Sequence, residues 1–512
     1  MRQLSHQQVY IFAILTSVLL SLLIGYRDSV INPDGICYLM GAEMLGSHSL
    51  RDVMHLCPQS QWPFYSTLIY AFAQISHVSY GLSAQLLNGL LSLVSVITFV
   101  SIVKLLGANQ RVLWLAALVI LFDHQFNILR DDIIRDHGFW AFYLISIYLL
   151  LRYFREPTAK TALLWNASLV IATLFRIEGA LFLLVLPFIS FAYLETPLKE
   201  RARVFITLNF PVLLFSSLLG LWLILHPQQE LGRVHEIINQ LQNGVTILVQ
   251  RFQTVKAALI QFVLPPESAS DAGVSVFMLW IGLYFYNLVM TLSGVYTLLL
   301  FYAFKARVVS FPAKSAPVIW GYFAVNFIMT LGFLAESLFV SKRYLVAFTL
   351  VLMIWIPFAL NNLIQKWPRF RYRVFLVCIA ILFFISALSS VVEFGRSKYF
   401  VRTAGTWLAS EVPANATLYV NDFQLMYYSH HFGMQIFQVL PQYLHVENMA
   451  HGEWKKYDYL ALRLRKNGNA QLSQLLNEIS DITPVKIFSD KHGNRVAVYK
   501  LHEKQTLIGE IR

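Results

Sequence analysis

The pattern of apolar positions along this chain consists mainly of long apolar runs separated by short polar connections. A membrane-spanning helix needs about 20 predominantly apolar residues to cross the hydrocarbon region of a bilayer. The runs therefore predict about eleven membrane-spanning helices. They lie at residues 8–26, 83–106, 112–123, 138–153, 161–175, 180–194, 203–225, 275–304, 315–335, 343–364 and 373–392.

The composition agrees with a membrane protein. Hydrophobic residues make up 57% of the chain and charged residues 13%, whereas soluble domains carry about 25% charged residues. The net charge of +12 would suggest nucleic acid in a soluble protein, but in a membrane protein it is first explained by basic loops that set topology. We therefore expect a membrane and no nucleic acid as partner. No small-residue cleavage site follows the first apolar run, so we interpret that run as an anchor and not as a signal peptide.

The positions of the basic residues predict the orientation. With a cytoplasmic N-terminus, every cytoplasmic loop is rich in lysine and arginine, as the positive-inside rule requires. These loops contain Lys104, Arg111, Arg152, Arg155, Lys160, Lys199, Arg201, Arg203, Lys305, Arg307, Lys314, Lys366, Arg369, Arg371 and Arg373. An odd number of spans then predicts a multi-pass inner-membrane protein with a periplasmic C-terminal domain.

Two domains are expected, a transmembrane domain at 1–392 and a periplasmic α/β domain at 393–512. The first has two long external loops, 27–82 and 226–274. Segments 39–45, 65–75 and 234–262 have amphipathic patterns, and we expect the first two to lie on the membrane surface. In the second domain, helices at 399–411 and 471–479 alternate with strands at 417–421, 457–463, 485–489 and 495–501.

The first external loop contains the first candidate for chemistry. Asp34 lies between Pro33 and Gly35, in a turn just outside the first span. A carboxylate there can act as a general base, or it can be the N-cap of a helix starting at Gly35. Cys37 and Cys57 lie in the same loop. They are either free thiols or a disulfide that closes about twenty residues and stabilises the fold by roughly 3 kcal/mol.

A second candidate is the charged connection before the fourth span. Oppositely charged residues four positions apart can form a local salt-bridge network. The two arginines could instead clamp a phosphate, or the last three acidic and histidine side chains could bind a divalent metal ion. The residues concerned are Arg130, Asp131, Asp132, Arg135, Asp136 and His137, with Asp132, Asp136 and His137 as the metal ligands.

Two further charged groups lie at the predicted outer face. Arg176 and Glu178 separate two apolar runs, and an ionisable pair at this depth is either functional or a mutual pair that stabilises a tight hairpin. Lys342 and Arg343, followed by Tyr344, open a late span. Because positive charge on this side opposes the orientation rule, its partner is either a lipid headgroup or substrate phosphate, or the side chains simply snorkel.

Taken together, these motifs resemble the GT-C superfamily of integral-membrane glycosyltransferases, particularly the bacterial branch related to protein O-mannosyltransferases and aminoarabinose-lipid A transferases. The resemblance covers most of the chain and depends on the order of its short motifs. They are Asp34 with Tyr38, Trp62-Pro63-Phe64-Tyr65, the charged loop before the fourth span, Ser341-Lys342-Arg343-Tyr344, and Thr403-Ala404-Gly405-Thr406-Trp407-Leu408. Gly35 and Gln61 depart from the family's pattern, which often has Glu after the first Asp and Lys or His before a Pro-Pro pair.

The resemblance implies a polyprenyl-phosphate-linked sugar as donor, a lipid, glycan or protein as acceptor, and inversion at the anomeric carbon. Asp34 would be the catalytic base. The donor phosphate would be held by Tyr38, Arg343 and Tyr344, with Arg130, Arg135, Arg176 and Lys342 as further cations on the same face. Asp131, Asp132, Asp136 and Glu178 are the secondary acidic candidates. The donor sugar, the acceptor and any need for a divalent metal ion stay open.

Two other functions remain as alternatives. A transporter or flippase of lipid-linked glycans would be expected to have repeated halves and interrupted helices near the midplane, and neither is evident in the sequence. An O-antigen ligase or polymerase also acts at the outer face, but its usual long late periplasmic loop is not obvious here.

Overall fold

The computed structural model describes residues 6–25, 30–193, 196–225, 233–309, 311–392, 398–413, 415–429, 452–466 and 472–501. The chain forms two compact units, each described by itself below. The helical unit contains Met1–Ile24 and Ala71–Val392. The sheet unit contains Glu393–Arg512 together with Gly25–Tyr70, so most of the predicted first external loop belongs to the same unit as the C-terminal domain.

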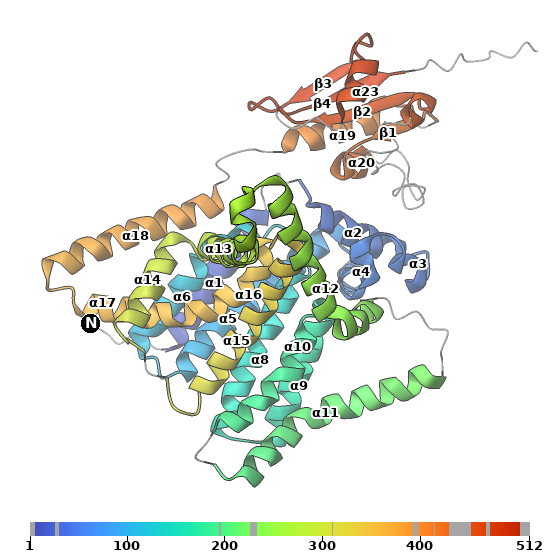
Figure 1. Ribbon diagram of the computed structural model, residues 1–512. Helices are drawn as coiled ribbons and strands as arrows, with labels where there is room; N and C mark the ends of the chain where they lie inside the picture. The colour runs from blue at the N-terminus through green and yellow to red at the C-terminus, as the bar shows by residue number, and fades with distance from the viewer. Residues whose placement is uncertain are drawn as a thin grey trace, which may run out of the picture. The chain divides into compact units, whose positions relative to one another are not determined.

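The helical unit is built almost entirely of α-helices (Figure 1). They are α1 (His6–Gly25), α5 (Tyr80–Leu105), α6 (Gln110–Leu121), α7 (His124–Ile128), α8 (Asp136–Arg155), α9 (Ala159–Phe175), α10 (Gly179–Val185), α11 (Leu198–Leu225), α12 (Arg233–Phe262), α13 (Ala272–Leu292), α14 (Gly294–Lys305), α15 (Ala316–Ser337), α16 (Lys342–Leu352), α17 (Ile356–Gln365) and α18 (Phe370–Val391), with 3-10 turns η2 (Leu186–Ala192), η3 (Pro266–Asp271) and η4 (Met353–Trp355). Helix α4 (Phe64–Ser76) crosses the boundary between the units.

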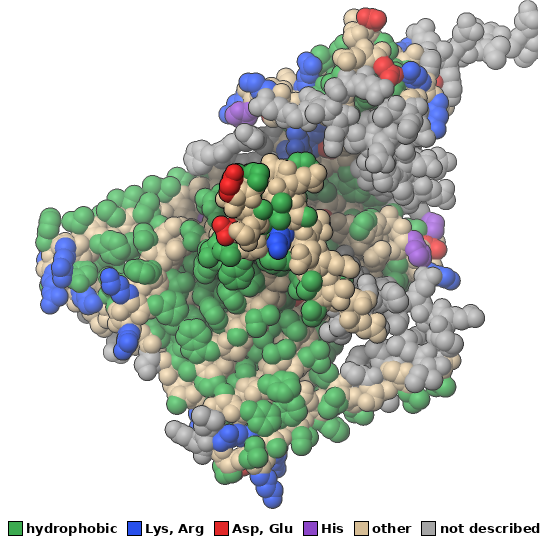
Figure 2. Space-filling model, in the orientation of Figure 1, with side chains coloured by type: hydrophobic (Ala, Val, Ile, Leu, Met, Phe, Trp, Pro, Cys, Tyr) green, Lys and Arg blue, Asp and Glu red, His purple; other side chains and the backbone are tan. Residues whose placement is uncertain are grey.

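The lengths and surfaces of these helices are those of membrane spans. Among the described residues, six helical segments are long and apolar enough to cross a bilayer, and four shorter apolar helices accompany them. Large side chains such as Leu15, Leu22 and Phe384 remain more than half exposed. Figure 2 shows hydrophobic side chains covering much of the visible face of this unit. Because lipid is the solvent that such a surface requires, the predicted polytopic α-helical membrane protein is confirmed.

Two of the predicted spans are interrupted. The run at 275–304 was expected to be one helix, but α13 ends and α14 begins at Ser293, whose φ is 67°. The run at 343–364 passes through the 3-10 turn η4, and Pro357 then occupies the first turn of α17. Proline lacks an N–H group and cannot continue the preceding helical hydrogen bonds. An apolar run thus predicts membrane residence but not helix continuity.

A hydrogen-bonded group of aromatic and polar side chains ties α8, α9 and α15 together. Asn326 donates to the hydroxyl of Tyr143 at 2.5 Å, and Trp165 donates to the hydroxyl of Tyr322 at 3.2 Å. The Tyr322 hydroxyl also lies 2.7 Å from Ser146. Such bonds hold helices together in lipid, where apolar burial drives association little.

The sheet unit combines short helices with one four-stranded sheet. Its elements are α2 (Pro33–Met44), α3 (Leu50–Met54), η1 (Pro58–Gln61), α19 (Tyr399–Glu411), β1 (Leu418–Val420), α20 (Phe423–Ser429), η6 (Glu453–Lys456), β2 (Tyr459–Leu464), α23 (Ser473–Glu478), β3 (Lys486–Ser489) and β4 (Arg495–Lys500). The strand order is β1-β2-β4-β3, with β1 parallel to β2 and the other two pairs antiparallel. The predicted small α/β domain is therefore confirmed, and α20 is an addition to it.

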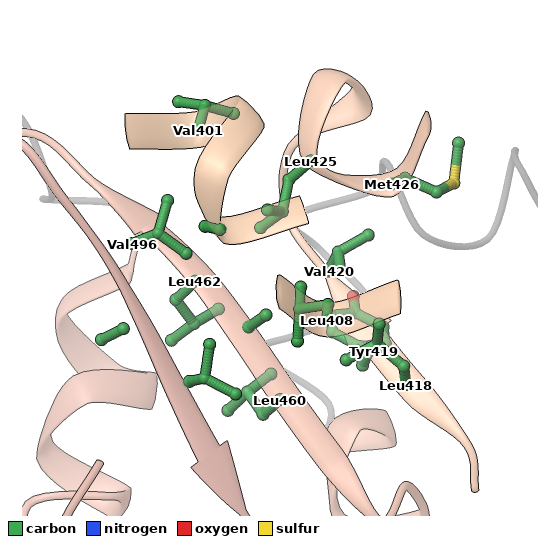
Figure 3. Close-up of a cluster of buried hydrophobic side chains, with 14 of the residues drawn as sticks. Val401, Leu408, Leu418, Tyr419, Val420, Leu425, Met426, Leu460, Leu462 and Val496 are labelled. Carbon is green, nitrogen blue, oxygen red and sulfur yellow. The ribbon is translucent and has the colours of Figure 1, made fainter. Parts of the chain in front are cut away.

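The core of the sheet unit explains where the first loop packs. Figure 3 shows Val401 and Leu408 of α19 gathered with side chains of α20 and the strands. Ile36, Met40 and Met44 of α2 belong to the same buried cluster. The prediction that segment 39–45 lies on the membrane surface was wrong, because its apolar face is covered by protein.

Candidate active site

Asp34 lies in the first turn of α2, and the helix begins earlier than the sequence suggested. Pro33 takes the first helical position, where its missing N–H is harmless, and Asn32 occupies the N-cap with φ −66° and ψ 152°. Asp34 is therefore not the capping residue. Its side chain is half-buried.

The carboxylate of Asp34 is oriented by a neighbour that the sequence did not reveal. Gln59 Nε2 donates to Asp34 Oδ1 at 2.9 Å. A disulfide joins Cys37, one turn after Asp34 on α2, to Cys57, two residues before Gln59. Ser60 adds two bonds within this turn, donating to the Cys57 carbonyl at 2.7 Å and accepting from the Cys57 N–H at 3.0 Å. The disulfide, one of two alternatives left open by the sequence, thus fixes η1 against the helix that carries Asp34.

Tyr38 lies one turn after Asp34 on α2 and is buried. Its side chain is 2% exposed. The ring packs edge-on against Tyr65, with 5.1 Å between ring centroids. Tyr38 therefore contributes to the packing of α2 against α4.

In the helical unit, three helix ends bring distant charged residues together. Arg176 follows the last residue of α9 and forms ion pairs with Asp136, at the start of α8, and with Glu178. The ring of Tyr344, near the start of α16, lies 4.2 Å from the Arg176 guanidinium. These residues, up to 208 positions apart in the printed sequence, form the Arg176 cluster. Because two carboxylates face it, the charge of Arg176 is already balanced.

The remaining cations near this cluster lie at its edge. Arg343 is half-buried; its guanidinium lies 5.2 Å from the Tyr344 ring and donates to the Tyr344 hydroxyl at 3.5 Å. Lys342 is exposed as the first residue of α16. Arg135 is half-buried beside the start of α8, and its charge acts on Glu178. These three side chains are more accessible than Arg176.

Arg130 is separate in its contacts and serves a packing role. It is 5% exposed and donates to Asn127 at 2.8 Å and to Ser21 at 2.9 Å, and it also contacts Ser17. The ring of Phe126 lies 5.1 Å from its guanidinium. Arg130 therefore ties the charged connection to α1.

The charged connection provides no metal-binding geometry. Nδ1 of His137 lies 3.3 Å from Ser92 Oγ and its Nε2 lies 2.9 Å from the Leu129 carbonyl. Asp136 is paired with Arg176, and the backbone carbonyl of Asp132 accepts from Asn88 at 2.8 Å. Asp131 and Asp132 are half-buried. Over the described ranges, no three His, Cys, Asp or Glu side chains are grouped so that they could hold a metal ion.

No family model and no curated protein matches the sequence. Among solved structures, ArnT from Cupriavidus metallidurans bound to undecaprenyl phosphate matches with a TM-score of 0.54 at 13% identity, covering 96% of this chain and 98% of that one. Arabinofuranosyltransferase AftD from Mycobacteria matches with a TM-score of 0.49 at 12% identity, covering 98% of this chain and 42% of that one. The similarity to ArnT over nearly the whole of both chains shows that this chain has the fold of the GT-C glycosyltransferases.

Proposed function

We propose that this protein transfers a sugar from a polyprenyl-phosphate donor to a lipid, glycan or protein acceptor at the periplasmic face of the inner membrane. The observation that carries the proposal is the geometry of Asp34, a half-buried carboxylate in a first helical turn, oriented by Gln59 and braced by a disulfide. The matching ArnT structure was solved with undecaprenyl phosphate, which supports a donor of this chemical class.

In the proposed reaction, Asp34 accepts the proton of the acceptor hydroxyl or amine. The acceptor atom then attacks the anomeric carbon from the side opposite the phosphate, the bond to phosphate breaks, and the configuration inverts. A base held in position contributes about 10²–10⁴-fold to the rate.

The leaving phosphate gains negative charge as the reaction proceeds. Cations fixed where that charge develops stabilise the transition state more than the ground state. We assign this role to Lys342 and Arg343, the exposed and half-buried cations at the start of α16, with Arg135 as a further candidate. We assign Arg176 a structural role, because its ion pairs with Asp136 and Glu178 already balance its charge.

Substitution of Asp34 tests the proposal. The donor sugar is first identified as the polyprenyl-linked sugar that accumulates in cells lacking the protein. Purified Asp34→Asn is expected to transfer that sugar at least about a hundredfold more slowly than the wild type, with near-normal thermal stability, because Asn keeps the oxygen that accepts from Gln59. Glu43→Gln is the matched control, since Glu43 is an exposed acid on the same helix.

Transfer by folded Asp34→Asn at close to the wild-type rate would refute the role of Asp34. The search for a base would then move to Asp131, Asp132, Asp136 and Glu178. The flippase alternative would be favoured if the purified protein moved the lipid-linked sugar across the membrane of a vesicle and Asp34→Asn did so at the same rate.

A further inference from the structure

The sheet unit contains a polar pocket outside the residues assigned so far. Its volume is about 380 Å³, within the range of about 300–1,000 Å³ that is usual for small-molecule sites. The lining comes from the start of α2, the approach to α19, the β1–α20 loop, the end of β2 and the β3–β4 turn. Pro33, the residue before Asp34, forms part of its wall.

One wall of the pocket is centred on Arg463. Its Nη1 pairs with Asp422 at 2.5 Å and donates to Gln424 Oε1 at 3.0 Å. The backbone of Arg463 is held in turn by Asn421, which accepts from its N–H at 2.7 Å and donates to its carbonyl at 3.1 Å. Within the described residues, the hydrogen bonds of the guanidinium all come from Nη1. Nε and Nη2 therefore make no hydrogen bond to the described residues and can donate to a ligand.

The turn between β3 and β4 also contributes to the lining, through Asp490 and Asn494. Asp490 accepts from the Asn494 side chain at 2.6 Å and from the backbone N–H groups of His492 and Asn494 at 2.8 and 2.9 Å. The hydrogen bond from the Asn494 side chain is the largest influence that lowers the pKa of Asp490. This carboxylate is thus charged and already engaged by its own turn.

The charges that line the pocket favour an anionic ligand. The lining contains the cations Lys398, Arg463 and Arg465 and the carboxylates Asp422 and Asp490, so positive charge is in excess by one. Both carboxylates accept the hydrogen bonds described above, whereas the cations are donors. Charge-assisted hydrogen bonds to a carboxylate or phosphate are about twice as strong as neutral ones.

The pocket also presents apolar surface beside these donors. Phe400 and Phe423 contribute to the lining. Donors fixed next to an aromatic surface suit a molecule with hydroxyl groups at its edge and C–H groups on its face, as in a sugar ring. A bare inorganic anion would make no use of the aromatic surface.

The pocket is connected to Asp34 through the chain that leads into α2. Gln424, which accepts from Arg463, donates through Nε2 to the Ile31 carbonyl at 2.7 Å. The N–H of Ile31 donates to the Tyr428 hydroxyl at 2.9 Å. Asp34 follows three residues later. A ligand in the pocket therefore lies beside the segment that positions the proposed base, within the same unit.

We propose that this pocket binds an anionic sugar of the acceptor, one that carries a carboxylate or a phosphate group. The role of the pocket in acceptor recognition rests on the proposed function. A sugar bound there would bring the next hydroxyl group of the acceptor toward the start of α2, where Asp34 lies. Binding itself requires neither the donor nor the transfer reaction. The two proposals can therefore fail separately.

Direct binding to the full-length protein in detergent tests the pocket. The probes are tetragalacturonate, mannose 6-phosphate and neutral galactotetraose, with affinity measured by calorimetry in the absence of donor. At least one anionic probe is expected to bind tenfold or more tightly than the neutral one. Comparison of the two anionic probes identifies whether carboxylate or phosphate is preferred.

Two lysine variants make the test specific. Lys398→Ala is expected to weaken binding of the anionic probe fivefold or more. The control is Lys486→Ala, because Lys486 is exposed on β3 and is not part of the lining. This control should change the affinity less than twofold. Lys398→Met, which keeps the aliphatic stem, replaces the alanine variant should the latter unfold. Asp34→Asn should bind the probe normally while losing transfer. Equal affinity for neutral and anionic probes, no binding of either anion, or unchanged binding in folded Lys398 variants would overturn the proposal.

Discussion

Removing the disulfide between Cys37 and Cys57 is expected to destabilise the sheet unit, because both cysteines lie in its Gly25–Tyr70 segment. The crosslink spans 20 positions in the sequence. For a loop of this length, loss of the constraint on the unfolded chain corresponds to about 3 kcal/mol. This segment supplies Ile36, Met40 and Met44 to the core of the unit. Destabilising this segment should therefore destabilise the sheet as well as the segment itself.

Hydrogen exchange measures this effect in the intact membrane protein. Because each 1.4 kcal/mol is a factor of ten, amides of β2 and β4 that open with the whole unit should exchange roughly a hundredfold faster in Cys37→Ser/Cys57→Ser. Helix α8, in the helical unit, is the internal reference. Cys378→Ser is the matched control, since Cys378 is an exposed free cysteine on α18.

The same double variant should also lose transfer activity, because η1 would no longer hold Gln59 against Asp34. Two results would refute the reasoning. One is unchanged exchange of β2 and β4 in the double variant. The other is full alkylation of Cys37 and Cys57 in the native protein before any reductant is added.

Two further predictions concern the helical unit. Arg176→Met should destabilise it by about 3–5 kcal/mol, because the buried Asp136 and the partly buried Glu178 would lose their counter-charge. Arg152→Met, at an exposed position, should be near neutral. Gly138→Ala should destabilise it by about 1–3 kcal/mol, because a Cβ at this position of α8 would lie 2.2 Å from the Phe175 ring. Gly89→Ala, whose Cβ would meet its nearest neighbour at 3.5 Å, is the control. Thermal unfolding in detergent measures all four variants.

Each pair has an outcome that contradicts its premise. If the two arginine variants unfold at the same temperature, the ion pairs of Arg176 do not support the helical unit. If the two glycine variants behave alike, the close approach of α8 and α9 tolerates a methyl group.

The sequence predicted those elements whose signal is carried by length and periodicity. The long apolar runs became helices of the membrane unit, and the strand at 495–501 became β4. The pattern could not reveal the break at Ser293, because an apolar run has the same composition with or without a kink. Helix α20 has only 7 residues, too few for a periodic signal.

The sequence identified candidate residues of the site but not the contacts that these residues make. Asp34 was identified by its turn, but the hydrogen bond from Gln59 joins positions 25 residues apart, and no spacing rule indicates it. The only signal nearby was Cys57. For Arg176, the pair with Glu178 was one of the alternatives that the sequence offered, and the structure forms it. The second partner, Asp136, lies 40 positions away, and no spacing rule indicates it.

The sheet unit is assembled from two stretches of chain that are synthesised at very different times. The bond between Gln424 and Ile31 joins residues 393 positions apart. At a synthesis rate of about 5–20 residues per second, α2 waits roughly 20 to 80 seconds for the strands and helices that cover it. During this interval the buried face of α2 has no partner from the C-terminal domain, while the disulfide within the early segment can already form. The helix that carries Asp34 therefore receives its final packing only when the C-terminal domain has emerged, so an incomplete chain would lack an ordered acid at this position.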